Sequence, residues 1–144
     1  MEKIKIAVSA VFGALTAWLG VLAIPFYVLV GLNVADYVTG IFAAKYRGQK
    51  ISSYVGLQGI IKKVCMWLLV VIGAVLDWLL KYAGEQIGID IKLNFLVAAV
   101  VAIWLICNEI ISILENISDI GVKLPPLLLK LTQNIKSKAE EAEK

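Results

Sequence analysis

Residues 6–44 read IAVSAVFGALTAWLGVLAIPFYVLVGLNVADYVTGIFAA, and this stretch decides the fold class of the chain. Its first part, from Ile6 to Ala35, holds 30 consecutive residues without a charged side chain. A helix that crosses a lipid bilayer needs about 20 apolar residues, so this run is too long for one crossing and too short for two. The chain is therefore expected to enter a membrane, and the run must contain a break or a kink.

The breaker cluster in this stretch consists of Trp18, Gly20 and Pro25. Proline removes a helical hydrogen bond, and the apolar pattern resumes directly after it. We therefore expect one helix near residues 6–22 and a second near residues 26–44. The alternative is a single long crossing that is kinked at this cluster.

The composition of the whole chain agrees with a membrane protein. Of its 144 residues, 60% are hydrophobic and 17% are charged, whereas soluble domains average about 45–50% and about 25%. A soluble fold of this length could not bury so much apolar surface. Histidine is absent, which excludes Ser-His-Asp and Cys-His catalysis. The two cysteines lie in apolar runs, and no nucleotide-binding motif is present. We expect no enzyme, no metal and no cofactor.

Two further apolar segments predict a third span near residues 64–80 and a fourth near residues 93–114. The connection before the third span has five cationic side chains and no acidic one: Lys45, Arg47, Lys50, Lys62 and Lys63. Lysine and arginine concentrate in cytoplasmic loops, so this connection is expected in the cytoplasm. Four crossings then place both chain ends in the cytoplasm, whereas three would leave the N-terminal lysines outside. The charge pattern favours four.

The predicted architecture is an all-α integral membrane fold, a four-helix transmembrane bundle with a three-helix bundle as the alternative. Residues 1–121 are expected to form the transmembrane domain. In residues 122–144, Pro125 and Pro126 suit the first turn of a helix, and leucines follow at helical spacing on one face. This part predicts an interfacial amphipathic helix that ends in a charged cytoplasmic tail.

An acidic residue lies deep in the second predicted span. Asp36 is about 13 Å from Lys45 along a regular helix. A charge at such depth costs at least about 2.5–3.5 kcal/mol, so this carboxyl should be protonated, paired or in contact with water. Intramembrane acids usually have a function. The alternative is a purely structural hydrogen bond to a neighbour such as Thr39 or Tyr37.

The fourth predicted span becomes amphipathic beyond residue 107. Its polar residues recur at helical spacing: Asn108, Glu109, Ser112, Glu115, Asn116 and Asp119. Lys62 and Lys63 enter the third span from the same side, so we expect Glu109 to pair with one of them. The alternative is a solvated helix face just outside the lipid.

Small residues in the first two spans are spaced for close helix contacts. In the second span, Gly40 and Ala44 follow Asp36 at intervals of four. Such spacing lets helix backbones approach closely, which drives association in lipid. Packing within one molecule and self-assembly would use the same pattern, and the sequence does not separate them.

Two segments together resemble a known family. DYVTGIFAAKYRGQKISSYVGLQGIIKKV, residues 36–64, and NEIISILENISDIGVKLPPLLLKL, residues 108–131, resemble the signatures of the toxin-secretion and phage-lysis holin family. The residues that carry the match are Asp36, Tyr37, Thr39, Gly40, Ser52, Ser53, Gly56, Gly59, Lys62, Lys63, Asn108, Glu109, Ser112, Glu115, Asn116, Gly121 and Pro125. The first span matches only in being apolar, and the loop before the fourth span does not match.

The resemblance implies a small phage or prophage protein of the bacterial cytoplasmic membrane. Such a protein oligomerises and then opens lesions at a set time, through which a cell-wall hydrolase (endolysin) or a toxin leaves the cell. The lipid bilayer, further copies of the chain, the released cargo and an antiholin are the implied partners, and no nucleic acid is expected. Two other functions fit the residues: a small ion-coupled transporter or channel that uses Asp36 and Glu109, and an antiholin or similar membrane regulator.

Overall fold

The computed structural model describes residues 1–92, 94–128, 130–131 and 134. Its elements are α1 (Glu2–Leu19), the 3₁₀ turn η1 (Gly20–Leu22), α2 (Ala23–Tyr46), α3 (Ser53–Gln86) and α4 (Leu96–Asp119). Three helical stretches are long and apolar enough to cross a membrane: residues 2–46, 53–86 and 96–119. The expected all-α membrane fold is therefore confirmed. The first stretch contains both helices that the sequence predicts for residues 6–44.

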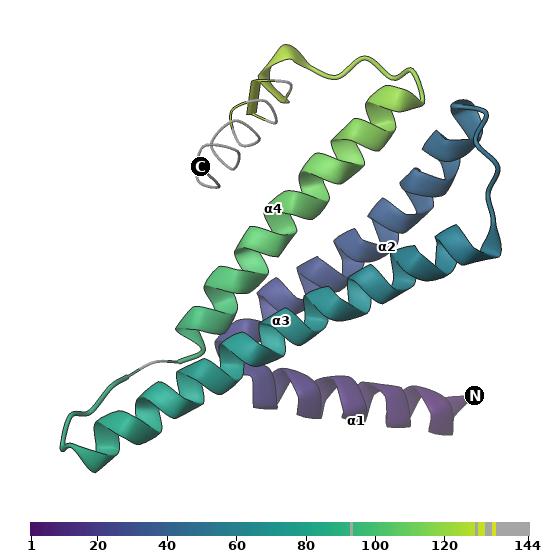
Figure 1. Ribbon diagram of the computed structural model, residues 1–144. Helices are drawn as coiled ribbons and strands as arrows, with labels where there is room; N and C mark the ends of the chain where they lie inside the picture. Colours follow the sequence, from purple (N-terminus) through teal and green to yellow (C-terminus); the bar gives the residue numbers. More distant parts are fainter. Residues whose placement is uncertain (93, 129, 132–133, 135–144) are drawn as a thin grey trace.

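The break between α1 and α2 lies at the glycine of the predicted cluster. Gly20 has a φ of 53°, a left-handed conformation that favours glycine. Pro25 lies in the first turn of α2, where its missing N–H removes no helical hydrogen bond. Figure 1 shows α1 and α2 meeting at this point and running in different directions. The second helix thus begins three residues before the predicted boundary, because proline starts it rather than interrupting it.

The third helix is much longer than its apolar centre. α3 has 34 residues, about 51 Å at 1.5 Å per residue, whereas the sequence predicts residues 64–80. The Ser52 hydroxyl caps its start by accepting a hydrogen bond from the Val55 amide at 3.2 Å. The hydrophobicity of the sequence therefore predicts only the central part of α3, which is suited to lipid. It does not predict the turns that extend the helix at both ends.

Helix α4 is the centre of the bundle. It packs along α2 and against the C-terminal half of α3, whereas α2 and α3 diverge toward the loop between them (Figure 1). The buried core at these contacts includes Leu22, Leu29, Met66, Val70, Ala98, Ala102 and Leu105. Only 17–22% of the most apolar window in each candidate span is buried. Most of the apolar surface is thus left for lipid or for other protein copies.

The N-terminus of α4 is fixed by α3. The Asp77 carboxylate accepts hydrogen bonds from the Val97 and Ala98 amides, both at 2.9 Å. One turn earlier, a Cβ on Gly73 would lie 2.8 Å from the Ala98 Cα. The two helices therefore touch at backbone distance, and a carboxylate from one helix caps the other.

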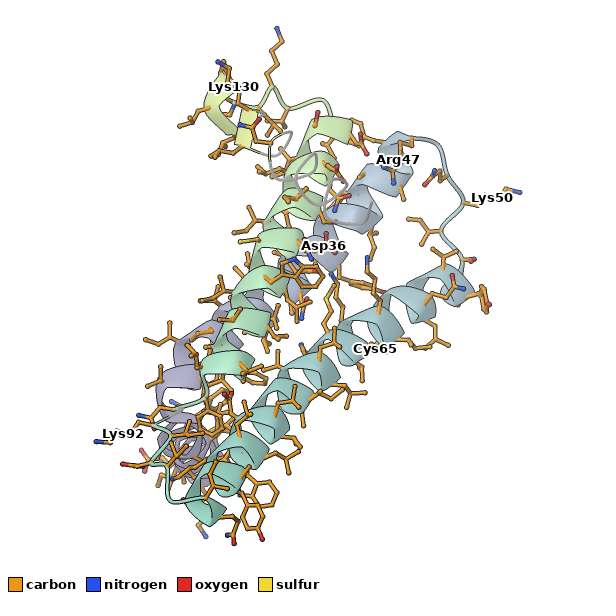
Figure 2. The ribbon with its side chains drawn as sticks, turned by 60° about the vertical axis from the view of Figure 1, so that its left-hand side comes forward. Asp36, Arg47, Lys50, Cys65, Lys92 and Lys130 are labelled. Carbon is orange, nitrogen blue, oxygen red and sulfur yellow. The ribbon has the colours of Figure 1, made fainter. Side chains whose placement is uncertain are left out.

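The two ends of the molecule differ in charge. Figure 2 shows Arg47 and Lys50 at the same end as Lys130, whereas Lys92 lies at the opposite end. Beyond α4 the backbone is helical at residues 126–128. Most of the interfacial helix and charged tail predicted for residues 122–144 lies outside the described residues.

Candidate functional site

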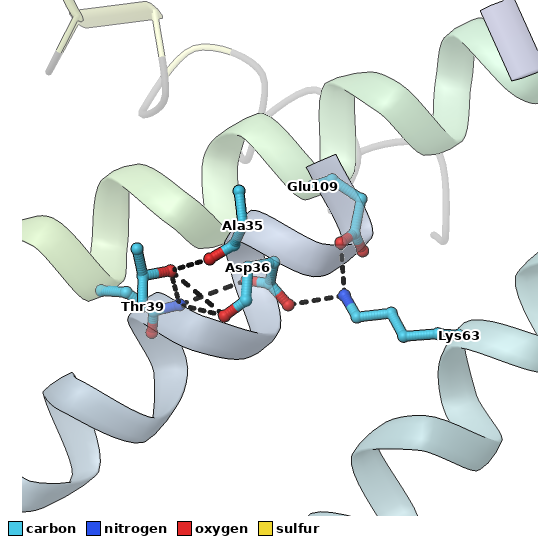
Figure 3. Close-up of polar contacts among 6 residues, drawn as sticks. Ala35, Asp36, Thr39, Lys63 and Glu109 are labelled. Atoms are coloured by element: carbon cyan, nitrogen blue, oxygen red, sulfur yellow. Dashed lines mark hydrogen bonds and ion pairs between the residues drawn. The ribbon is translucent and has the colours of Figure 1, made fainter. Parts of the chain in front are cut away.

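A cluster of three charged side chains joins the three long helices inside the bundle. Lys63 of α3 donates a hydrogen bond to Asp36 Oδ2 of α2 at 2.5 Å and another to Glu109 Oε2 of α4. Figure 3 shows the ammonium between the two carboxylates. The side chains of Lys63, Asp36 and Glu109 are 11%, 14% and 2% exposed. One cation thus connects two acids that come from different helices.

The cluster is buried among the helices, where isolated charges are costly. Each of its members is within an apolar helix that is long enough to span a membrane. A buried ion pair stabilises a fold little in net terms, but removing one partner leaves an uncompensated charge and costs about 3–5 kcal/mol. The cluster therefore makes the arrangement of α2, α3 and α4 depend on all three groups being present.

Asparagine and tryptophan side chains complete the inner side of the cluster. With its amide oriented to satisfy both neighbours, Asn33 donates to Glu109 Oε2 at 3.0 Å and accepts from Trp67 Nε1 at 2.8 Å. Asn33 is 3% exposed. The Glu109 carboxylate is thus held by groups from both α2 and α3.

A second asparagine satisfies Asp36 from the other side. Asn116 Nδ2 of α4 lies 3.2 Å from both Asp36 Oδ1 and Thr39 Oγ1. The Thr39 hydroxyl donates to the Ala35 carbonyl at 2.9 Å. Asp36 therefore pairs with Lys63 and Asn116, while Thr39 turns its hydroxyl to its own helix and to Asn116.

The remaining predicted residues surround the cluster. Tyr37 packs against α3, where a Cβ on Gly56 would lie 3.2 Å from its hydroxyl. Gly40 lies against Asn116, since a Cβ there would be 3.6 Å from Nδ2. Lys62 is exposed and Ser112 is half-buried, and both line a cavity beside the cluster. Of the two lysines considered for Glu109, the structure places Lys63 against it.

Two other predicted residues lie on α4 away from the centre of the cluster. Asn108 is half-buried and Glu115 is exposed. Near the end of the same helix, Asp119 pairs with Arg47, which follows the last residue of α2. This partly exposed ion pair joins the charged ends of two helices.

Three polar residues at helix contacts were missed from the sequence: Asn33, Trp67 and Asp77. Asn33 precedes Asp36 by three residues and Trp67 follows Lys63 by four, so helical spacing could have placed each on the same face as its neighbour. Nothing in the sequence predicts that Asp77 accepts hydrogen bonds from the first amides of α4. In the described part of the chain, no group of three histidine, cysteine, aspartate or glutamate residues is arranged to hold a metal ion.

Comparison with known proteins gives the family. The model of the bacteriophage holin family matches residues 13–137. An uncharacterized protein of Listeria monocytogenes is 34% identical over 133 residues, covering 92% of this chain and 86% of its own. An uncharacterized protein of Halalkalibacterium halodurans is 38% identical over 122 residues, covering 85% and 80%.

A more distant relative has a functional name. The probable holin of Bacillus phage phi105 is 27% identical over 97 residues, covering 67% of this chain and 63% of its own. No solved structure matches the chain. The match to the family model includes α2, α3, α4 and every residue of the charged cluster. With its apolar helices, the chain is a multi-pass membrane protein, and it belongs to the bacteriophage holin family.

Proposed function

We propose that this protein accumulates in the bacterial cytoplasmic membrane, oligomerises and opens lesions at a set time during lysis. The observation that carries this proposal is the buried cluster of Asp36, Lys63 and Glu109. These groups pair with one another within one molecule, so the chain can remain in lipid with all three side chains largely buried. They also provide a polar helix face that could line water if the helices separated.

The exposed surface of the bundle supports assembly. Most residues of each span are not buried, and in α1 only Leu19 is. The α1 face that carries Gly13 is open, since a Cβ there would meet nothing within 4 Å. Helices with small residues and open faces associate through close packing in lipid. We infer that α1 contributes to contacts between copies.

Opening requires the cluster to exchange its partners. In the lipid-sealed form Lys63 is shared by two carboxylates of its own molecule. In an open assembly, water or the polar groups of neighbouring copies would take over these contacts. The lesion would then be lined by the helix faces that carry Asp36, Glu109 and Asn116, while the apolar faces remain in lipid.

The proposed topology places the cationic end in the cytoplasm. Arg47, Lys50 and Lys130 share one end of the molecule (Figure 2), as cytoplasmic ends of membrane proteins share an excess of lysine and arginine. The transmembrane domain would comprise residues 1–121, and residues 122–144 would form the cytoplasmic segment. A cell-wall hydrolase is the proposed cargo, a toxin is the alternative cargo, and an antiholin is the proposed regulator.

A second candidate function uses the same cluster. Two acids that share one lysine could carry protons through a small ion-coupled transporter or channel. Such a protein would dissipate an ion gradient without releasing proteins. An antiholin would bind a holin and release nothing when expressed alone.

The test is regulated expression in a bacterium that also contains a cytoplasmic reporter enzyme. Growth, membrane potential and reporter release are followed together. A delayed, abrupt loss of potential with release of the reporter supports the proposal. Gradual depolarisation without release supports the transporter, and growth without either change supports a regulator; both results contradict lesion formation.

A further inference from the structure

A cavity of about 520 Å³ lies beside the charged cluster, where α2 and α3 diverge. Figure 2 shows Asp36 within the bundle and Lys50 on the loop at the cationic end. The lining residues come from α2, the loop after it, the first turns of α3, and α4. The cavity therefore extends from the cationic end of the molecule toward the buried cluster.

The lining of the cavity favours an anion. It contains three lysines, Lys50, Lys62 and Lys63, and one acid, Asp36, so its formal charge is +2 (three minus one). Lys63 is already paired with Asp36 and with Glu109, whose carboxylate lies beside the cavity rather than in its lining. Lys50 and Lys62 are exposed and form no ion pair within the described residues. Two cationic groups at the cavity are thus left for an anionic ligand.

The rest of the cavity favours a ligand with an acyl chain. Apolar side chains form much of its wall: Ile41, Ala44, Ile51 and Val55. Asp36 lies 11 residues before Arg47, about 16 Å along α2, so the cavity extends from the cationic end toward the middle of an apolar helix. A free phosphate would leave these walls uncovered, and a nucleic acid could not enter the lipid beside them.

We propose that this cavity binds one anionic phospholipid from the leaflet that faces the cationic loop. Lys50 and Lys62 bind the headgroup phosphate, and an acyl chain lies along the apolar wall between α2 and α3. The lipid fills the space that these helices leave, next to the Lys63 ion pairs. This site does not depend on lesion formation and can be tested on protein that never opens the membrane.

The test uses the full chain in vesicles of phosphatidylglycerol and phosphatidylcholine at a ratio of 1:4. Spin-labelled forms of each lipid report the fraction held immobile by the protein. Wild type should prefer phosphatidylglycerol. Each lysine near an anionic surface strengthens the preference for an anionic lipid roughly fivefold. The variant Lys50→Gln/Lys62→Gln should therefore lose most of the wild-type preference for phosphatidylglycerol.

Two further variants separate a built site from general surface attraction. Lys3→Gln/Lys5→Gln removes the same charge from the start of α1, outside the cavity lining, and should retain most of the preference. Val55→Trp fills the cavity from a position that is 59% exposed, and it should lower the bound fraction at unchanged charge.

Three results would overturn the proposal. They are equal binding of both lipids by wild type, an equal loss in the two double-lysine variants, or no effect of Val55→Trp. Circular dichroism checks that each variant keeps its helix content. If Lys50→Gln/Lys62→Gln fails this check, the single substitution Lys62→Gln replaces it. This variant should show a preference for phosphatidylglycerol about fivefold weaker than that of wild type.

Discussion

Lys63 lies between Asp36 and Glu109, so one side chain of α3 ties together two acids that belong to α2 and α4. These two acids are 73 residues apart in the sequence (109 minus 36) and meet only because α2 and α4 pack along each other. α2 and α3 have few other contacts, since they diverge beyond this point. The lysine is therefore the main polar link between α3 and the α2–α4 pair at this depth.

Removing the lysine should destabilise the bundle. Lys63→Gln leaves two carboxylates without their cation, and we expect a loss of about 3–5 kcal/mol in the free energy of unfolding. Thermal unfolding in detergent, followed by circular dichroism, measures this loss. The matched control is Lys62→Gln, which removes the same charge from an exposed neighbour and should change the stability by less than about 0.5 kcal/mol. Equal effects of both substitutions would mean that the cluster has no special role.

The carboxylate that caps α4 should matter for local order. Asp77→Asn keeps the size of the side chain but weakens acceptance from the Val97 and Ala98 amides. We expect a cost of about 0.5–2 kcal/mol, as for other helix caps. Hydrogen exchange should show faster exchange at those two amides. Asp90→Asn changes an exposed acid near the start of α4 and should leave their exchange unchanged.

A glycine sets the distance between α3 and α4. Gly73→Ala places a methyl group 2.8 Å from the Ala98 Cα, so the two backbones must separate. We expect destabilisation by about 1–3 kcal/mol from overpacking. Gly13→Ala introduces the same methyl group where nothing lies within 4 Å. It should stabilise α1 by up to about 1 kcal/mol. If Gly13→Ala lowered the stability and Gly73→Ala did not, the close contact of α3 with α4 and the open face of α1 would both be contradicted.

The ion pair at the helix ends should contribute little. Arg47 and Asp119 have side chains that are 42% and 40% exposed. Exposed pairs are worth about 0–1 kcal/mol, so Arg47→Gln should lower the unfolding temperature much less than Lys63→Gln does. The same thermal unfolding measurement compares them. An effect of Arg47→Gln as large as that of Lys63→Gln would show that this end, rather than the buried cluster, holds the bundle together.

The sequence predicts the parts of this fold that depend on local rules. Lipid exposure requires apolar runs, so hydrophobicity alone indicates the membrane class, the approximate spans and the break near Gly20. The cost of a charge in lipid identifies Asp36 and Glu109 as residues that need partners. Lys63 was one of two candidates because both lysines enter the same helix from the same side.

The remaining features depend on the relative register of the helices, which the sequence does not reveal. Asn33 and Trp67 meet Glu109 only because three helices converge there. Asp77 is buried against the first amides of α4 only because α3 and α4 pack closely at that point. Likewise, the packing of Tyr37 against Gly56 follows from how α2 crosses α3.

Replacing the whole cluster tests its function most directly. The variant Asp36→Leu/Lys63→Met/Glu109→Leu removes all three charges together, so no unpaired charge remains, and it should lose less stability than Lys63→Gln, although Asn33 loses Glu109 as its acceptor. The measurement is delayed release of a cytoplasmic reporter enzyme at matched membrane levels of both proteins. We expect a folded, membrane-inserted variant that releases no reporter, because its lesion would lack charged groups in the lining. Release with wild-type timing and amount would contradict the account.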